Sequence, residues 1–147
     1  MRLKILTAIA ALLASVSAFT GELDGKAIIC MPEKTTTGEP EWYEFKDGEA
    51  IQFNLGTRGT TAKVLRMSHG EYEAEPTIVT WGETSITHRL DRVTLEHTMS
   101  SSIKGDGFVW RTQCEVAESL EAFTGSIEAY KQRRQEVVNQ EMRNNRI

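Results

Sequence analysis

The sequence lacks an excess of positive charge. Its 17 lysines and arginines are outnumbered by 21 aspartates and glutamates, and the net charge at pH 7 is −4. Proteins that bind nucleic acids or anionic membranes need a basic face to attract the phosphates. The composition therefore argues against both classes of binding. Internal repeats, low-complexity segments and linkers are also absent, so a chain of 147 residues favours one domain with a modest core.

Long hydrophobic runs are missing except near the start of the chain. There Arg2 and Lys4 precede an apolar run over residues 5–13, which small residues follow at 16–18. This run is shorter than the roughly 20 residues that a membrane-spanning helix needs. The pattern is typical of a cleaved export signal, so residues 1–18 are predicted to be a signal peptide that leaves no membrane anchor. A periplasmic or secreted location follows from this prediction.

Cysteine is scarce: the chain has only Cys30 and Cys114. In an exported protein a pair of cysteines is predicted to form a disulfide. A catalytic thiol would need a surrounding that lowers its pKa, and the sequence around Cys114 shows only the alternation of a strand. Cys30 and Cys114 belong to the first and last expected strands, so the disulfide would join these strands as a seam and help to close a barrel.

Between residues 26 and 116 the chain consists of short alternating runs separated by turn residues. This pattern predicts a mainly β fold, an antiparallel barrel or sandwich of about eight strands. One hairpin is expected across Ser68-His69-Gly70, and another with Asp91-Arg92 as its two-residue turn. The expected strands are "KAIICM", "EWYEF", "EAIQFNL", "AKVLRM", "EYEA", "TIVTW", "SITHRL", "RVTLEHTM" and "FVWRTQCEV".

After Val116 the hydrophobic period changes from two to about three and a half, which predicts a C-terminal α-helix. Ser119 is a suitable N-cap for it. The apolar stripe comprises Leu120, Phe123, Ile127, Tyr130 and Val137. The chain thus divides into a β-domain at 19–116 and a helix with a polar tail at 117–147. The part after residue 130 is either a solvated helix or a helix that binds a partner or a second copy of the chain.

The segment "ITHRLDRVTLEHTM" holds His88 and His97 on apolar strand faces, as diagonal neighbours in the expected hairpin. A zinc site needs at least three protein ligands, and Asp91 and Glu96 lie at the turn or on the opposite face. No metal, no cofactor and no catalytic residue is therefore predicted. Buried polar groups find partners, so both histidines are expected to hydrogen-bond to neighbours that the sequence leaves open.

Two resemblances add to this description. The elements "LDGK", Cys30, Trp81, "LDRVTL" and "QCEV" resemble a loose group of small exported bacterial and phage proteins of unknown function. The segment "SHGEY" is similar to the Ser-Gly…Tyr segment of periplasmic inhibitors of c-type lysozyme, which are small barrels with a comparable cysteine pair. This chain departs from that pattern in the inserted His69 and in its C-terminal helix. The second resemblance implies binding roles for Ser68 and Tyr72.

The sequence thus predicts an exported, non-enzymatic binding protein. Its partner would be a small apolar ligand inside the barrel or a protein on the helix and loops. The alternatives are a lysozyme inhibitor-like protein and a metal-dependent or histidine-dependent hydrolase. The candidate binding residues are His88, His97, Ser68 and Tyr72. A barrel filled by side chains would contradict the ligand hypothesis, and an open apolar cavity would support it.

Overall fold

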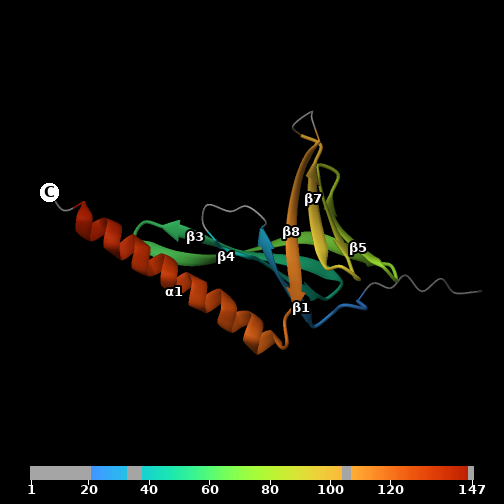
Figure 1. Cartoon of the computed structure of the whole chain (residues 1–147), viewed down its shortest axis with the longest axis horizontal. Coiled ribbons are helices and arrows are strands. Elements are labelled where there is room, and N and C mark those ends of the chain that lie inside the picture. Colours follow the sequence, from blue (N-terminus) through green and yellow to red (C-terminus); the bar gives the residue numbers. More distant parts are fainter. Residues whose placement is uncertain (1–20, 33–37, 104–106, 146–147) are drawn as a thin grey trace, which may run out of the picture.

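The computed structural model describes residues 21–32, 38–103 and 107–145, and the expected signal peptide at 1–18 lies outside them. Within these residues eight antiparallel strands close into a barrel, and one long helix follows (Figure 1). The elements are β1 (Lys26–Pro32), β2 (Glu41–Lys46), β3 (Glu49–Arg58), β4 (Thr61–Ala74), β5 (Ile78–Glu83), β6 (Ile86–Asp91), β7 (Glu96–Ser101), β8 (Phe108–Val116) and α1 (Leu120–Asn144).

The barrel has the simplest antiparallel order, because each strand pairs with its neighbour in the sequence and β1 pairs with β8. Of the two predicted architectures, the barrel is therefore the one that forms. Cys30 lies directly opposite Cys114 in the β1–β8 register, and the two are joined by the predicted disulfide. The disulfide fastens the strand pair that closes the barrel, as the sequence predicted. It also agrees with folding in an oxidising compartment.

The predicted hairpin at Ser68-His69-Gly70 is wrong, because β4 runs through these residues without reversing. The register between β3 and β4 shifts here, with Glu49 opposite Glu71 but Ile51 opposite Ser68. The extra residue of β4 forms a β-bulge, and Gly70 takes the positive φ of 80° that such an irregularity favours. A bulge changes which residues face inward, so one strand shows the two alternation patterns that suggested two strands.

The turn between β6 and β7 is also longer than predicted, since it holds residues 92–95 and not a two-residue Asp91-Arg92 turn. One carboxylate oxygen of Asp91 accepts the N–H groups of the two residues at 93 and 94, at 2.8 and 2.9 Å. This local hydrogen bonding offers the backbone an alternative to the ladder. Leu90 consequently pairs with His97, where Val93 was expected.

Two apolar clusters hold the fold together, one on each side of the barrel wall. The inner cluster contains Ile28, Cys30, Tyr43, Phe45, Ala50, Tyr72, Ala74, Val79, Trp81, Leu90 and Cys114. The outer cluster contains Ala27, Trp42, Phe123 and Ile127. Phe123 and Ile127 are the buried residues of α1, and Ser119 caps the helix by accepting the N–H of Ala122 at 3.0 Å. The predicted helix and its N-cap are thereby confirmed.

The long helix packs along the outer face of the β3–β4 hairpin (Figure 1). Gln135 fixes the tip of this hairpin, because its Oε1 accepts the N–H of Ala62 at 2.8 Å and its Nε2 donates to the carbonyl of Thr60 at 2.9 Å. The distal half of α1 is therefore part of the folded domain. Within the described part of the chain, no helical segment has the length and apolar character that a membrane crossing requires.

We expect Gln135→Ala to lower the free energy of unfolding by about 1 to 2 kcal/mol, because it removes the hydrogen bonds to Ala62 and Thr60 and a third to Asn139 Oδ1, and it leaves the N–H of the buried Ala62 without this partner. Gln132→Ala is the matched control, since Gln132 is exposed on the same helix. Urea unfolding at pH 7 measures the difference. Equal midpoints for the two variants would show that the contact adds nothing to stability.

Candidate functional site

The two histidines of the β6–β7 hairpin lie side by side inside the barrel. The side chain of His88 is 1% exposed and that of His97 is 0% exposed. They are diagonal neighbours in the observed register, and His88 Nδ1 lies 3.0 Å from His97 Nε2. The planes of the two rings differ by only 7°. The hydrogen-bond partner that the sequence left open for each histidine is therefore, first of all, the other histidine.

Neighbouring strands extend this pair into a network that crosses half of the barrel. On β8, Thr112 Oγ1 lies 2.9 Å from His97 Nδ1. On β5, the ring of Trp81 lies nearly parallel to both imidazoles, with its centroid 5.3 Å from each. Among the described residues, Trp81 Nε1 and His88 Nε2 are buried without a hydrogen-bond partner. Each neutral ring carries one proton. The direction in which the hydrogen bonds run between Thr112, His97 and His88 therefore decides whether His88 Nε2 is a donor or an acceptor.

Glu41 lies at the edge of this network. Its carboxylate accepts hydrogen bonds from the Tyr43 hydroxyl at 3.1 Å and from Trp110 Nε1 at 2.8 Å. Burial raises the pKa of the Glu41 carboxyl above its ordinary value, and these two hydrogen bonds offset part of that rise. Glu41 Oε2 is also 3.8 Å from His97 Nδ1. The contact joins a carboxylate to a neutral ring at neutral pH, because His97 titrates well below 7.

The environment keeps both imidazoles uncharged. Burial lowers the pKa of His88 to about 3, and the nearby His97 and His69 contribute to the shift. Burial lowers the pKa of His97 to about 4, with a further contribution from His69. Loss of hydration is the largest cause for both rings, so the uncharged form is favoured in each.

His69 is the member of the cluster that sequence reasoning missed. It is half-buried on β4, where its Nε2 lies 2.7 Å from Gln52 Oε1, and its ring centroid is 4.7 Å from that of His88. The sequence suggested a separate turn at His69. The bulge at Gly70 is the reason for the difference, because it keeps His69 within a strand next to the barrel interior.

The four candidate binding residues do not form one site. Tyr72 is fully buried, and its hydroxyl accepts the N–H of Leu23 at 2.8 Å and donates to Asp24 Oδ1 at 3.0 Å. It therefore fastens the segment that leads into β1. Ser68 is exposed on β4, and its hydroxyl donates to Glu49 Oε2 at 2.8 Å. His88 and His97 belong to the buried network and lie away from this surface serine.

One group of side chains in the described part of the chain has the composition of a metal site. The ligand atoms of Cys30, His97 and Cys114 all lie within 4.8 Å of one another, and all three residues are buried. The two sulfur atoms are bonded to each other, so they cannot ligate a metal in this oxidised form. Sequence reasoning paired the cysteines but did not place a histidine beside them.

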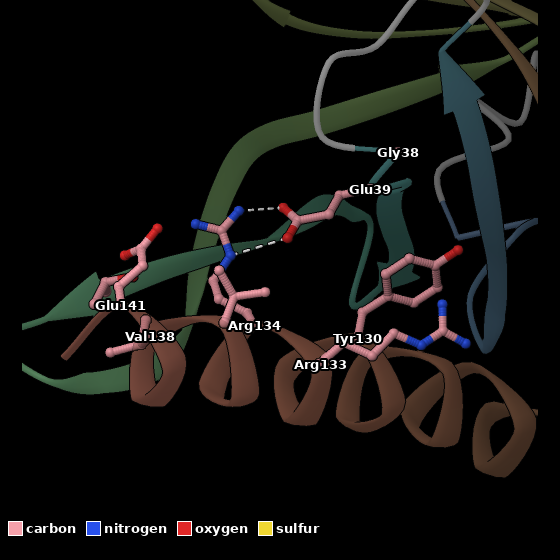
Figure 2. Close-up of a pocket in the computed structure, with 9 residues that line it drawn as sticks. Gly38, Glu39, Tyr130, Arg133, Arg134, Val138 and Glu141 are labelled. Atoms are coloured by element: carbon pink, nitrogen blue, oxygen red, sulfur yellow. Dashed lines mark hydrogen bonds and ion pairs between the residues drawn. The ribbon is translucent and has the colours of Figure 1, made fainter. Parts of the chain in front are cut away.

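The outer surface has a groove between the distal half of α1 and the segment before β2, which we call the α1 groove (Figure 2). Its volume is about 440 Å³, and it is lined by Gly38, Glu39, Thr57, Tyr130, Arg133, Arg134, Val137, Val138 and Glu141. Arg134 forms a two-pronged ion pair with Glu39 across the groove. The guanidinium of Arg133 lies 4.7 Å from the centroid of the Tyr130 ring.

Comparison of the chain with family models, curated proteins and solved structures gives no significant match.

Proposed function

We propose that this protein is an exported, non-enzymatic binding protein that takes up a segment of a partner protein in the α1 groove. The observation that carries the proposal is the groove itself, which lies outside the barrel and combines apolar, aromatic and charged side chains. Tyrosine and arginine are enriched among the residues that dominate protein interfaces. The groove therefore has the composition of a protein-binding surface.

The barrel interior supports the same choice of partner. Bulky side chains occupy it, and the largest fully buried ones include Tyr43, Phe45, Tyr72, His88 and His97. A barrel that holds a small apolar ligand needs an open apolar space, whereas this interior is crossed by aromatic rings and a polar network. The small-ligand hypothesis therefore has less support than the protein-partner hypothesis.

The hydrolase alternative also has less support. A general base must lie within hydrogen-bond reach of the proton that it removes. His88 and His97 are almost fully buried, and both nitrogens of His97 already have partners in the protein. A substrate in solution would have to open the barrel wall to reach either ring.

The chemistry of the α1 groove indicates which partner segment would fit. Val137 is 54% exposed and offers an apolar contact. Arg133 lines the same groove with its guanidinium over the Tyr130 ring, and it presents a planar set of N–H donors, a geometry that suits a carboxylate. Arg134 is already paired with Glu39. We therefore propose a segment that carries an apolar side chain next to an aspartate or glutamate.

Site-specific photocrosslinking tests the proposal in the producing cell. A photoreactive residue replaces Arg133 or Val137, and the control replaces Thr87, which is exposed on β6. We expect one discrete crosslinked product from both groove positions and none from position 87. We also expect the mature protein in the exported fraction, with its N-terminus at Phe19. A product at all three positions, or at none, would contradict the proposal.

A product with twice the mass of the protein would identify the partner as a second copy of the chain. Light scattering of wild type and Val137→Glu then decides between the two kinds of partner. A dimer that Val137→Glu converts to a monomer would support self-association through α1. A wild-type monomer together with a heavier crosslinked product would support a separate protein.

The exposed hydroxyl of Ser68 favours a second candidate, a lysozyme inhibitor-like protein. Inhibition of c-type lysozyme by the purified protein tests it directly. If this candidate is correct, Ser68→Ala abolishes the inhibition, while Ser100→Ala, at an exposed serine of β7, leaves it unchanged. Tyr72 is unsuitable for this assay because its substitution would disturb the core. An uninhibited lysozyme would remove this candidate.

A further inference from the structure

We propose that the reduced form of this protein binds Zn²⁺ through Cys30, Cys114 and His97. The three residues come from β1, β8 and β7, three strands that follow one another around the barrel. Their ligand atoms already lie within 4.8 Å of one another, and all three are buried. Two thiolates and one imidazole form a set that zinc accepts, with one position left for water or another ligand.

Opening the disulfide brings the sulfur atoms into range for zinc with little movement. Tetrahedral zinc with bonds of about 2.3 Å to sulfur and 2.0 Å to nitrogen places two sulfurs about 3.8 Å apart and each sulfur about 3.5 Å from the nitrogen. The Cα atoms of Cys30 and Cys114 are 3.9 Å apart, so both side chains remain next to each other after reduction. Rotation of the two side chains is sufficient to separate the sulfurs.

His97 is prepared to act as a ligand. A histidine binds metal in its neutral form, and His97 is fully buried, which disfavours its charged form. Zinc would replace one of the two present hydrogen-bond partners of His97, Thr112 at Nδ1 or His88 at Nε2, and the other ring nitrogen would keep its partner. Such a second partner fixes the orientation of a ligating imidazole. Glu41 is the nearest carboxylate, with its Oε2 3.8 Å from His97 Nδ1.

The switch between the two states is a thiol–disulfide exchange. A dithiol reductant transfers two electrons and two protons to the Cys30–Cys114 bond, which gives two thiols, while the reductant becomes a disulfide. Zinc then displaces both thiol protons and binds the thiolates. Under oxidising conditions the cysteines stay bonded and the site is closed. The metal would take over the covalent link between β1 and β8 when the disulfide is open.

Cobalt(II) serves as the spectroscopic probe for this site. The full-length mature protein is reduced with a phosphine that binds no metal, and Co²⁺ is added without oxygen. We expect visible d–d bands and a thiolate-to-cobalt charge-transfer band that Zn²⁺ removes. We expect neither band in the oxidised protein. A folded, reduced protein that shows no charge-transfer band would overturn the proposal.

Variants assign the ligands. His97→Gln should weaken Co²⁺ binding by about tenfold or more, whereas His69→Gln, at a half-buried histidine that supplies no ligand atom, should weaken it far less. Near-ultraviolet circular dichroism reports whether the reduced protein is folded. If reduction unfolds it, Zn²⁺ should restore the native spectrum of wild type but not that of His97→Gln. Equal affinities for the two histidine variants, or binding without recovery of the native spectrum, would refute the site.

Discussion

The free energy of unfolding is expected to fall steeply as the pH drops from 6.5 towards 4. His88 and His97 have pKa values of about 3 and about 4 in the folded protein, against 6.5 for an ordinary histidine. Below pH 6.5 the unfolded chain therefore binds protons that the folded chain excludes. The contribution of the two uncharged, buried histidines to the free energy of unfolding is fully present above pH 6.5. It is lost progressively as the pH falls to the pKa values of the folded protein.

The expected effect is large for a domain of this size. For each histidine the slope rises from half of about 1.4 kcal/mol per pH unit at pH 6.5 towards that full value at lower pH, so the pair removes roughly 4 kcal/mol between pH 6.5 and 4.5. Small domains are stable by only about 5 to 15 kcal/mol. Burial also lowers the pKa of His69, which adds to the loss, whereas the raised pKa of Glu41 opposes it. Urea unfolding at a series of pH values measures the slope.

A single substitution isolates the contribution of the pair. His88→Gln keeps a polar side chain at the position but removes one buried titrating group. We expect lower stability at pH 7, because the hydrogen bond to His97 is disturbed, and a pH slope that is smaller by about 1.4 kcal/mol per pH unit. His69→Gln, at the half-buried position, should change the slope less. Parallel pH profiles for wild type and His88→Gln would show that other groups cause the acid sensitivity.

The parts of this fold that the sequence predicted are those in which local pattern and tertiary structure agree. Alternation over residues 26–116 indicated the strands, because a barrel wall buries every second side chain. The pairing of Cys30 with Cys114 followed from their being the two cysteines of a chain that carries an expected export signal, and their positions in the first and last strands predicted that the disulfide would join these strands. The change of period after Val116 indicated α1, and Ser119 was suited to cap it.

The errors arose where turn residues lie inside a strand or in a longer loop. Ser68-His69-Gly70 has the composition of a turn, but closure of the barrel requires β4 to continue, and the bulge resolves the conflict. The carboxylate of Asp91 holds a four-residue loop at the place where a two-residue turn was expected. The bulge depends on how residues 49–51 pair with residues 68–71, which the composition of the segment does not report. The Asp91 loop rests on local hydrogen bonds from the carboxylate, which the prediction of a two-residue turn did not take into account.

The candidate site shows the same division. The alternation of the β6–β7 hairpin placed His88 and His97 on the inner face, and even the wrong register left them diagonal neighbours. Their distance from Thr112 and from the disulfide depends on how β7 pairs with β8, which no local pattern reports. The α1 groove could not be predicted either, because its two walls are distant in the sequence.

Removal of the disulfide is expected to have the second large effect. Cys30 and Cys114 are separated by 84 residues. On the chain-entropy model, a link across a loop of this length stabilises the folded state by about 4 to 5 kcal/mol, because it restricts the unfolded chain. We expect Cys30→Ala/Cys114→Ala to lose most of this amount in urea unfolding at pH 7. Alanine is preferred to serine because it leaves no buried hydroxyl without a partner.

The dependence of the free energy of unfolding on pH in this double variant then shows whether the barrel stays closed without the disulfide. If β1 and β8 remain paired, the histidines stay buried, and the variant should be destabilised by the same amount at every pH. If the seam opens, water reaches His97 through the gap beside β8, its pKa rises towards 6.5, and the slope becomes shallower. We expect the first result, because hydrogen bonds join β1 to β8 over five residue pairs. A loss below about 1 kcal/mol would contradict the chain-entropy account for this protein.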